Sequence, residues 1–259
     1  MESGAPDVIA AMGRVRLDQL LVARGLVQSR ERARAMVLAG LVTVGGQTVS
    51  KAGTRVDEHA DVAIREPEHP WVSRGGVKLA HALDRFGVDV TGRVALDIGA
   101  STGGFTDVLL QRGAARVVAL DVGHGQLDWR LRTDPRVHVI EGVNARGLRP
   151  DDLPPDLRAF DVITVDVSFI SLRHILPVLP ALLKPEGRVM ALVKPQFEAG
   201  RADVGKGGIV RDPAVHERVL DEIARAAHQV GLQRVAVEPS PIRGAEGNVE
   251  FFFFLTSNF

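Results

Sequence analysis

The stretch VALDIGASTGGFT, residues 94–106, is an apolar run followed by a glycine-rich turn and the start of a helical pattern. A strand that leads through such a turn into a helix is the place where a nucleotide cofactor meets an open parallel sheet. Glycines in the turn let the backbone approach a ligand and adopt angles that other residues avoid. We therefore predict a cofactor loop made of Gly99, Ala100, Ser101, Thr102, Gly103, Gly104 and Phe105.

Two polar residues further along the chain indicate which cofactor this loop holds. Asp121 ends the next apolar run, about twenty residues on, where an acid can hold ribose hydroxyls. Asn144 follows the third run, where its amide can meet an adenine edge. The nicotinamide fingerprint is not matched, because Ser101 occupies its second glycine position. S-Adenosylmethionine is favoured over a nicotinamide cofactor, and a purely structural turn is the remaining alternative.

Outward from the loop, apolar runs alternate with helical patterns, which is typical of a doubly wound α/β sheet. A helix is expected over residues 213–230 and a doubly buried strand at Phe251–Phe254. Seven strands that end in a hairpin resemble the Rossmann-like methyltransferase sheet. The strands are expected at residues 94–98, 116–120, 137–140, 160–165, 188–193, 234–237 and 249–255.

In front of this sheet, the pattern predicts a small α+β module. Apolar positions at helical spacing indicate a helix over residues 15–26, and a second helix begins near Ser29 and ends at Gly40. Residues 41–49 read as a hairpin turning at two adjacent glycines, and residues 61–64 close the small sheet.

The charge of the chain is zero overall but unevenly distributed. Between residues 14 and 34 there are six arginines against only Asp18 and Glu31. Such a local basic surface indicates a polyanion partner, although a solvated helix face would show the same pattern. The candidates for phosphate contacts are Arg14, Arg16, Arg30, Arg32 and Arg34.

Length and composition set further limits. The chain has 259 residues, 45% of them hydrophobic, and contains no cysteine, so disulfides and thiolate metal sites are excluded and no metal is expected. Neither a signal peptide nor a membrane span is visible, so we expect a cytoplasmic protein without a membrane partner. We expect a flexible tail at 1–13, the small α+β module at 14–66, a proline-marked linker at 67–73 and the α/β domain at 74–259.

Charged residues stand at the ends of two expected strands, where open parallel sheets bind ligands. Asp166 follows DVITV and Lys194 follows VMALV. The chain has 27 arginines and only five lysines, and lysine, unlike arginine, can lose its proton. These residues are therefore candidates for deprotonating an alcohol, and a structural ion pair between them is the alternative.

Residues 14 to about 65 resemble the αL-type RNA-binding domain of ribosomal small-subunit proteins. Behind it, RGGVKL, DIGASTGGFTD, DVSFISL, LVKPQFE and GNVEFFFFL occur in an order that resembles the TlyA haemolysin-type ribosomal RNA methyltransferases of the FtsJ-like group. Where this chain has His69-Pro70-Trp71-Val72, that family reads Arg-Ala-Trp-Val. The resemblance implies a catalytic tetrad of Lys78, Asp166, Lys194 and Glu250.

The resemblance also implies an activity: transfer of a methyl group from S-adenosylmethionine to cytidine 2'-hydroxyls in the RNA of one or both ribosomal subunits. In this hypothesis Lys194 deprotonates or polarises the hydroxyl, and Asp166 and Lys78 position it. Glu250 then orients Lys194 or the ribose. Oligomeric state stays open.

Three other functions are weighed against this one. A membrane-active haemolysin lacks a visible span, and the FFFF run is too short to supply it. A non-catalytic RNA-binding regulator would not need an intact cofactor loop and tetrad. A nicotinamide-dependent oxidoreductase comes last, because it has no role for Lys78 or for the basic module.

Overall fold

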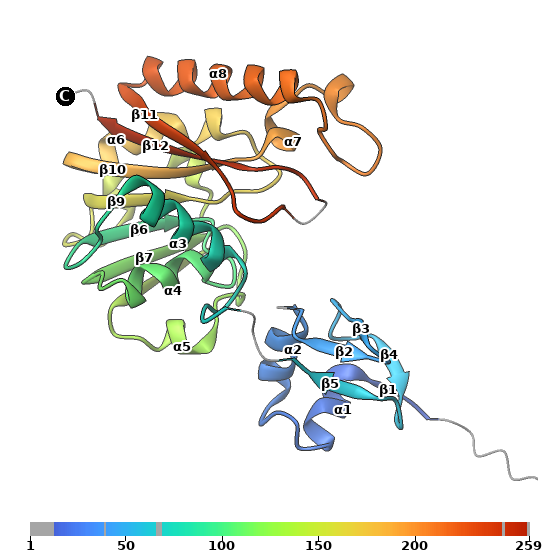
Figure 1. Cartoon of the computed structure of the whole chain (residues 1–259). Helices are drawn as coiled ribbons and strands as arrows, with labels where there is room; N and C mark the ends of the chain where they lie inside the picture. Colours follow the sequence, from blue (N-terminus) through green and yellow to red (C-terminus); the bar gives the residue numbers. More distant parts are fainter. Residues whose placement is uncertain (1–12, 39, 66–68, 245–246, 258–259) are drawn as a thin grey trace, which may run out of the picture. The chain divides into compact units, whose positions relative to one another are not determined.

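The computed structural model describes residues 13–38, 40–65, 69–244 and 247–257. The chain divides into two compact units, Met1–Pro70 and Trp71–Phe259 (Figure 1). Residues 1–12 of the expected tail, residue 66 at the end of the expected module and residues 67–68 at the start of the expected linker lie outside the described part.

Two helices form the core of the first unit. α1 (Leu17–Ala23) and α2 (Arg30–Leu38) pack against each other through their apolar faces. Ser29 caps α2 as the sequence indicated, because its Oγ accepts a hydrogen bond from the backbone N–H of Arg32 at 3.2 Å. The buried apolar residues of the unit are Leu17, Leu20, Leu21, Val27, Ala33, Val37, Val42 and Val56.

Small antiparallel sheets complete the first unit. The expected hairpin is present, since β2 (Val42–Val44) pairs with β3 (Gln47–Thr48), and β5 (Val62–Ile64) pairs with the other side of β2. The first helix begins at Leu17, two residues later than predicted. Its expected first turn is part of β1 (Arg14–Arg16), which pairs with β4 (Arg55–Asp57), so a partner distant in sequence overrides the local helical pattern.

The second unit contains the predicted seven-stranded sheet, in the order β11-β12-β10-β9-β6-β7-β8. The five strands from β10 to β8 run parallel, and β12 is antiparallel to both of its neighbours. The bounds are β6 (Val94–Ile98), β7 (Arg116–Asp121), β8 (Val137–Glu141), β9 (Phe160–Val165), β10 (Leu183–Val193), β11 (Leu232–Pro239) and β12 (Phe251–Ser257).

Helices cover both faces of this sheet (Figure 1). α3 (Gly75–Phe86) and α4 (Gly104–Gln111) pack on one face, while α6 (Leu179–Leu182) and α8 (Pro213–Gln229) pack on the other. Shorter segments lie in the connections: α5 (Trp129–Arg132), α7 (Pro195–Glu198) and the 3₁₀ turns Ala145–Gly147, Pro150–Asp152, Leu172–His174, Leu176–Val178 and Arg201–Asp203.

Strand β12 contributes side chains to the hydrophobic clusters on both faces of the sheet. Phe252 packs with α3 and α4, whereas Phe253 packs with α8, so the strand is buried on both faces as its continuous apolar run predicted. Within the described residues, no helix is both long enough and apolar enough to cross a bilayer.

Candidate active site

The sheet brings three of the four expected catalytic residues to one edge. Asp166 directly follows β9 and Lys194 directly follows the parallel strand β10. Glu250 directly precedes β12, which runs antiparallel to β10, so it lies at the same edge. Lys78 comes from the first turns of α3. This is the edge where open parallel sheets bind their ligands.

The four residues form two ion pairs. Lys78 Nζ lies 2.5 Å from Glu250 Oε2, and Lys194 Nζ lies 2.6 Å from Asp166 Oδ1. Lys78, Lys194 and Glu250 are buried, so their charges depend on these partners rather than on water. The hypothesis that Glu250 orients Lys194 directly therefore has no support here, because the carboxylate of Glu250 meets Lys78.

The ion pair between Lys194 and Asp166, which the sequence analysis kept as a structural alternative, is thus present. It leaves hydrogen-bonding capacity on Asp166 unused. Besides the Lys194 ammonium, Asp166 Oδ1 has no hydrogen-bond donor among the described residues, although it is buried. Lys194 also donates to Ser168 Oγ at 2.9 Å. A buried carboxylate oxygen with spare acceptor capacity at the ligand-binding edge can take a proton or a hydroxyl hydrogen bond.

Sequence reasoning missed the aromatic residues beside this pair. Phe169 is 90% exposed and has a φ of +63°, a left-handed conformation that bulky residues rarely adopt. Its ring packs on Phe197 with 5.2 Å between centroids, and Lys194 Nζ lies 6.0 Å from the centroid of Phe197. Neither residue is part of a periodic pattern, so only the adjacent motif residues could have drawn attention to them.

The loop that carries Phe169 is fastened at its far end by Glu198. This carboxylate accepts hydrogen bonds from Ser171 Oγ at 2.5 Å and from the backbone N–H of Leu172 at 2.7 Å. Burial raises the pKa of Glu198, and the two hydrogen bonds oppose that rise. Because Asp166 holds the near end, the backbone of Phe169 is fixed on both sides.

The predicted cofactor loop packs tightly against the catalytic residues. Gly99 has a φ of +84°, and a Cβ there would lie 2.3 Å from the backbone oxygen of Asp166. Gly103 has a φ of +96°, and a Cβ there would lie 2.2 Å from Leu131 Cδ1. A Cβ at Gly104 would lie 2.4 Å from Ser73 Oγ. At all three positions a side chain would collide with neighbouring atoms, so glycine is required.

A pocket opens beside the loop, lined by Ala100, Ser101, Asp121, Gln126, Leu127 and Glu141 among others. The Asp121 carboxylate accepts one hydrogen bond at each oxygen, from the backbone N–H of Ser101 at 2.8 Å and of Gly123 at 2.7 Å. A carboxylate has about four acceptor positions, so two remain for ribose hydroxyls. Gln126 and Glu141 were not predicted, because each lies in a segment without a motif.

The other expected cofactor residues, Phe105, Thr102 and Asn144, do not line this pocket. Phe105 points into the core, where its ring centroid lies 5.9 Å from that of Phe252, so only its backbone can face a ligand. Thr102 offers its backbone oxygen to the N–H of Asp128 at 3.2 Å. Asn144 does not line the pocket, and its side chain caps the turn that follows it.

Asp97, within the motif, is a buried acid that sequence reasoning passed over. Its carboxyl accepts hydrogen bonds from Thr106 Oγ1 at 2.7 Å and from Thr164 Oγ1 at 2.9 Å. Complete burial raises the pKa of Asp97 to about 7, and the nearby Asp166 charge adds to this rise. Asp97 therefore ties α4 to β9 beneath the active edge.

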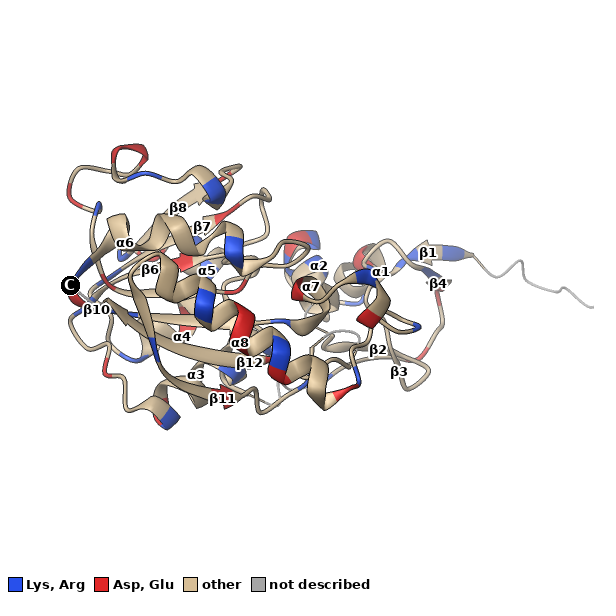
Figure 2. Cartoon of the chain, turned by 90° about the horizontal axis from the view of Figure 1, so that it is seen from above, with Lys and Arg blue, Asp and Glu red and all other residues tan. Residues whose placement is uncertain are grey.

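In the first unit the candidate arginines fall into two groups. Arg16 donates two hydrogen bonds, at 3.0 and 2.9 Å, to the fully buried Asp18, and Arg30 reaches the same carboxylate at 3.5 Å. The others, Arg14, Arg32 and Arg34, are exposed, and their side chains form no ion pair or hydrogen bond with a described residue. Figure 2 shows the basic strand β1.

Together, the sheet order, the glycine-rich loop and the lysine–carboxylate pairs define a Rossmann-like methyltransferase. The model of the FtsJ-like methyltransferases matches residues 71–257, and that of the S4 domain matches residues 15–62. The chain belongs to the FtsJ-like methyltransferase family, and within it to the TlyA group, and it carries an S4 domain in front of the methyltransferase domain.

Individual relatives agree with this placement. The 16S/23S rRNA (cytidine-2'-O)-methyltransferase TlyA of Mycobacterium tuberculosis strain H37Rv is 48% identical over 93% of this chain and 90% of its own. Hemolysin A of Brachyspira hyodysenteriae is 41% identical over 92% of this chain and 98% of its own. A solved structure of a hemolysin-named protein from Streptococcus thermophilus superposes with a TM-score of 0.73 at 44% identity, covering 95% of this chain and 90% of that one.

Proposed function

We propose that this protein methylates the ribose 2'-hydroxyl of cytidine in ribosomal RNA, with S-adenosylmethionine as the methyl donor. The observation that carries the proposal is the pair of buried lysine–carboxylate contacts at the ligand-binding edge, next to the glycine-rich loop. Relatives that share nearly the whole chain bear the name of this activity. The basic S4 domain in front accounts for a polyanionic substrate.

The residues around the loop suit S-adenosylmethionine. Asp121 has acceptor capacity for ribose hydroxyls, and Ala100 and Ser101 of the loop line the pocket beside it. Leu127 supplies an apolar wall to the same pocket. When bound, the cofactor supplies an activated methyl group, so the protein's task is to align and deprotonate the acceptor.

The two ion pairs divide that task. Lys194 donates to Ser168 and faces Asp166, so it acts as a cation that stabilises negative charge developing on the 2'-oxygen. The Asp166 carboxylate would accept the hydroxyl proton, while bound S-adenosylmethionine would supply the methyl group for the 2'-oxygen. Lys78, held by Glu250, fixes the ribose in line with the methyl group.

The target base meets an aromatic surface in this arrangement. Phe169 is exposed beside Lys194 and supported from behind by Phe197. Stacking on an aromatic face stabilises an unpaired base in RNA recognition. The left-handed conformation of Phe169, fixed at both loop ends, directs this ring outward.

The test is transfer of a labelled methyl group from S-adenosylmethionine to purified small and large ribosomal subunits, followed by nuclease digestion to identify the nucleoside. We expect labelled 2'-O-methylcytidine with the wild type and at least a 100-fold lower rate with Lys194→Ala. Lys184→Ala is the matched control, because this lysine lies on the same strand but pairs with Asp161 at 2.9 Å, away from the site. No transfer to either subunit, with cofactor binding intact, would favour a non-catalytic RNA-binding role.

A further inference from the structure

Exposed apolar side chains of the second unit gather at two places. Val235 and Val237 lie on the edge strand β11. The others, Val122, Trp129 and Phe169, lie in connections that leave the carboxyl ends of β7 and β9, the edge that carries the active site. Trp129 is the largest of these side chains and is 73% exposed.

The helix that carries Trp129 is firmly anchored. On either side of it, Leu127 and Leu131 are buried against Gly103 of the cofactor loop. Asp128 caps α5 by accepting a hydrogen bond from the N–H of Arg130 at 2.9 Å. The position of the Trp129 backbone is thus set by the cofactor loop itself.

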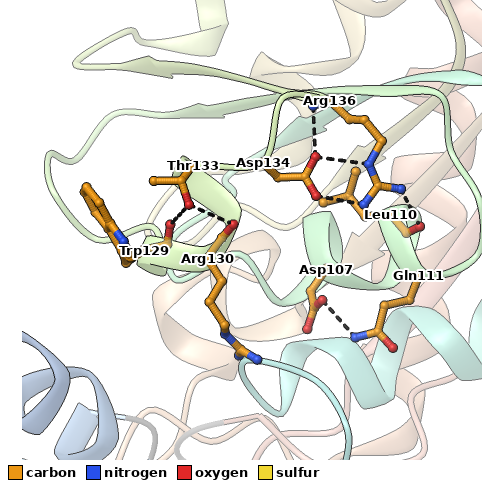
Figure 3. Close-up of polar contacts among 8 residues, drawn as sticks. All are labelled: Asp107, Leu110, Gln111, Trp129, Arg130, Thr133, Asp134 and Arg136. Atoms are coloured by element: carbon orange, nitrogen blue, oxygen red, sulfur yellow. Dashed lines mark hydrogen bonds and ion pairs between the residues drawn. The ribbon is translucent and has the colours of Figure 1, made fainter. Parts of the chain in front are cut away.

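Hydrogen bonds also fix the end of this helix (Figure 3). Thr133 Oγ1 donates to the backbone oxygen of Trp129 at 2.9 Å. The next residue, Asp134, accepts from Arg136 Nη2 at 2.7 Å, and Arg136 Nη1 donates to the backbone oxygen of Leu110 at 3.3 Å. Figure 3 shows the indole directed away from all of these groups.

An exposed indole on a firmly anchored backbone, with no ring contact to another described residue, points to a ligand. Ordering an aromatic platform in advance lowers the entropic cost of binding. Arg130 and Arg146 are exposed on the same edge, and the contact of Arg130 with Asp128 is a surface ion pair of little strength. A flat exposed ring, with arginines elsewhere on the same edge of the sheet, fits an unpaired segment of RNA, whose base stacks while phosphates of the same strand meet the arginines.

We infer that Trp129 is a second RNA contact, on the catalytic unit, that stacks on an unpaired base of the ribosomal RNA near the methylated nucleotide. The inference rests on the proposed function for the identity of the RNA. It assigns α5 two tasks, because its Leu131 packs against Gly103 of the cofactor loop while its Trp129 presents the indole.

The first experiment uses the chain's own fluorescence. The protein has two tryptophans, Trp71 and Trp129, so the full-length Trp71→Phe variant reports on Trp129 alone. We expect its emission to be quenched readily by acrylamide in the free protein. Deproteinised 16S and 23S ribosomal RNA should quench the emission and shield it from acrylamide. An indole already shielded without RNA would mean that another part of the chain covers it, and would overturn the inference.

The second experiment measures affinity with Trp129→Ala and Trp129→Phe in the otherwise unchanged protein. We expect the alanine variant to bind deproteinised ribosomal RNA about tenfold more weakly and to raise the KM for RNA similarly, and the phenylalanine variant to retain most of the affinity. S-Adenosylmethionine affinity should stay unchanged in both. Val235→Ala, which removes an exposed apolar side chain far from this edge, should have no effect.

The outcomes separate this inference from the proposed function. If wild-type protein methylates RNA and Trp129→Ala binds and reacts equally well, the inference fails and the function stands. If methyl transfer is absent but RNA still shields Trp129, the contact stands and the function fails. A loss of affinity that phenylalanine does not rescue would show a structural effect and would contradict stacking.

Discussion

At the scale of single residues, the candidate active site consists of charges neutralised in pairs and largely shielded from water. The pairing Lys78 with Glu250 and Lys194 with Asp166 leaves each lysine with one carboxylate as its principal partner. The two pairs are adjacent. Val193 pairs with Phe251 across the sheet, so Lys194 and Glu250 stand opposite each other one step beyond the ladder.

Lys194→Arg separates an electrostatic role from proton transfer. A guanidinium keeps the positive charge but cannot accept a proton. We therefore expect this variant to retain turnover clearly above that of Lys194→Ala, although its larger head group will reduce the rate. If both variants lose turnover equally while folding and cofactor affinity stay unchanged, a neutral Lys194 would instead be the base that accepts the hydroxyl proton.

Glu250→Gln should destabilise the protein as well as inactivate it. The substitution leaves the buried ammonium of Lys78 without a countercharge, which typically costs about 3–5 kcal/mol of unfolding free energy. Urea denaturation measures the loss. The double variant Lys78→Met/Glu250→Gln should recover much of the stability but no activity, and the absence of recovery would contradict the pairing.

Asp97 gives the stability of the protein a pH dependence. Its pKa is about 7 in the folded chain and 3.8 ordinarily, so the folded state holds the proton more tightly. This contribution to stability is complete below pH 4 and falls by roughly 4 kcal/mol as the pH rises to about 7. Asp97→Asn can keep both threonine contacts and should lack this fall. Urea unfolding at pH 5 and pH 8 tests it, and parallel profiles for the two proteins would contradict it.

At the scale of elements, one buried amide joins two loops beside the site. Asn248 is 1% exposed, its Oδ1 accepts from the N–H of Val210, and its Nδ2 donates to the backbone oxygen of Gly208, both at 2.9 Å. It lies two residues before Glu250. The glycine-rich segment 205–210 is thereby fastened to the start of β12.

Asn248→Ala should loosen both elements together. Losing both hydrogen bonds leaves the buried N–H of Val210 unpaired, which costs about 1–3 kcal/mol, whereas the oxygen of the exposed Gly208 can turn to water. We expect a lower unfolding midpoint, faster amide hydrogen exchange at Val210 and a reduced kcat because Glu250 is less well held. Asp212→Ala, which removes an exposed helix cap nearby, is the control and should leave kcat unchanged.

The elements that sequence predicted well are those whose pattern is local. Strands such as Phe160–Val165 and helix Pro213–Gln229 carry continuous or periodic apolar residues that need no partner to be recognised. Strand Arg14–Arg16 was missed because only Arg55–Asp57, distant in sequence, makes it a strand. In the site, motif positions were identified, but the pairing partners and Phe169 depend on tertiary contacts that no local pattern encodes.

At the scale of the whole molecule, a neutral chain carries a local excess of basic over acidic residues at the start of the S4 domain, with six arginines against two acids between residues 14 and 34. Charges of both signs alternate on the exposed face of α8 (Figure 2), whereas Arg14, Arg32 and Arg34 of the S4 domain lack acidic partners among the described residues. Affinity for RNA should therefore come largely from that domain and weaken with salt.

Arginine variants in the S4 domain should separate into two kinds. Arg32→Ala and Arg34→Ala should each weaken RNA binding and lower the slope of log affinity against log salt by about 0.7–0.9, with unchanged stability. Arg16→Ala should chiefly lower stability, because it leaves the buried Asp18 with the more distant Arg30. Equal salt slopes in wild type and Arg32→Ala would remove that residue from the RNA surface.

The position of β12 between β10 and β11 has a consequence for biosynthesis. A chain that stops before residue 250 has neither Glu250 nor the strand that covers the edge of β10. Such a nascent chain exposes the open edge of β10, which can pair with other chains. Under the proposed function we expect a nascent chain without Glu250 to be inactive, so it should not modify the ribosome that is making it.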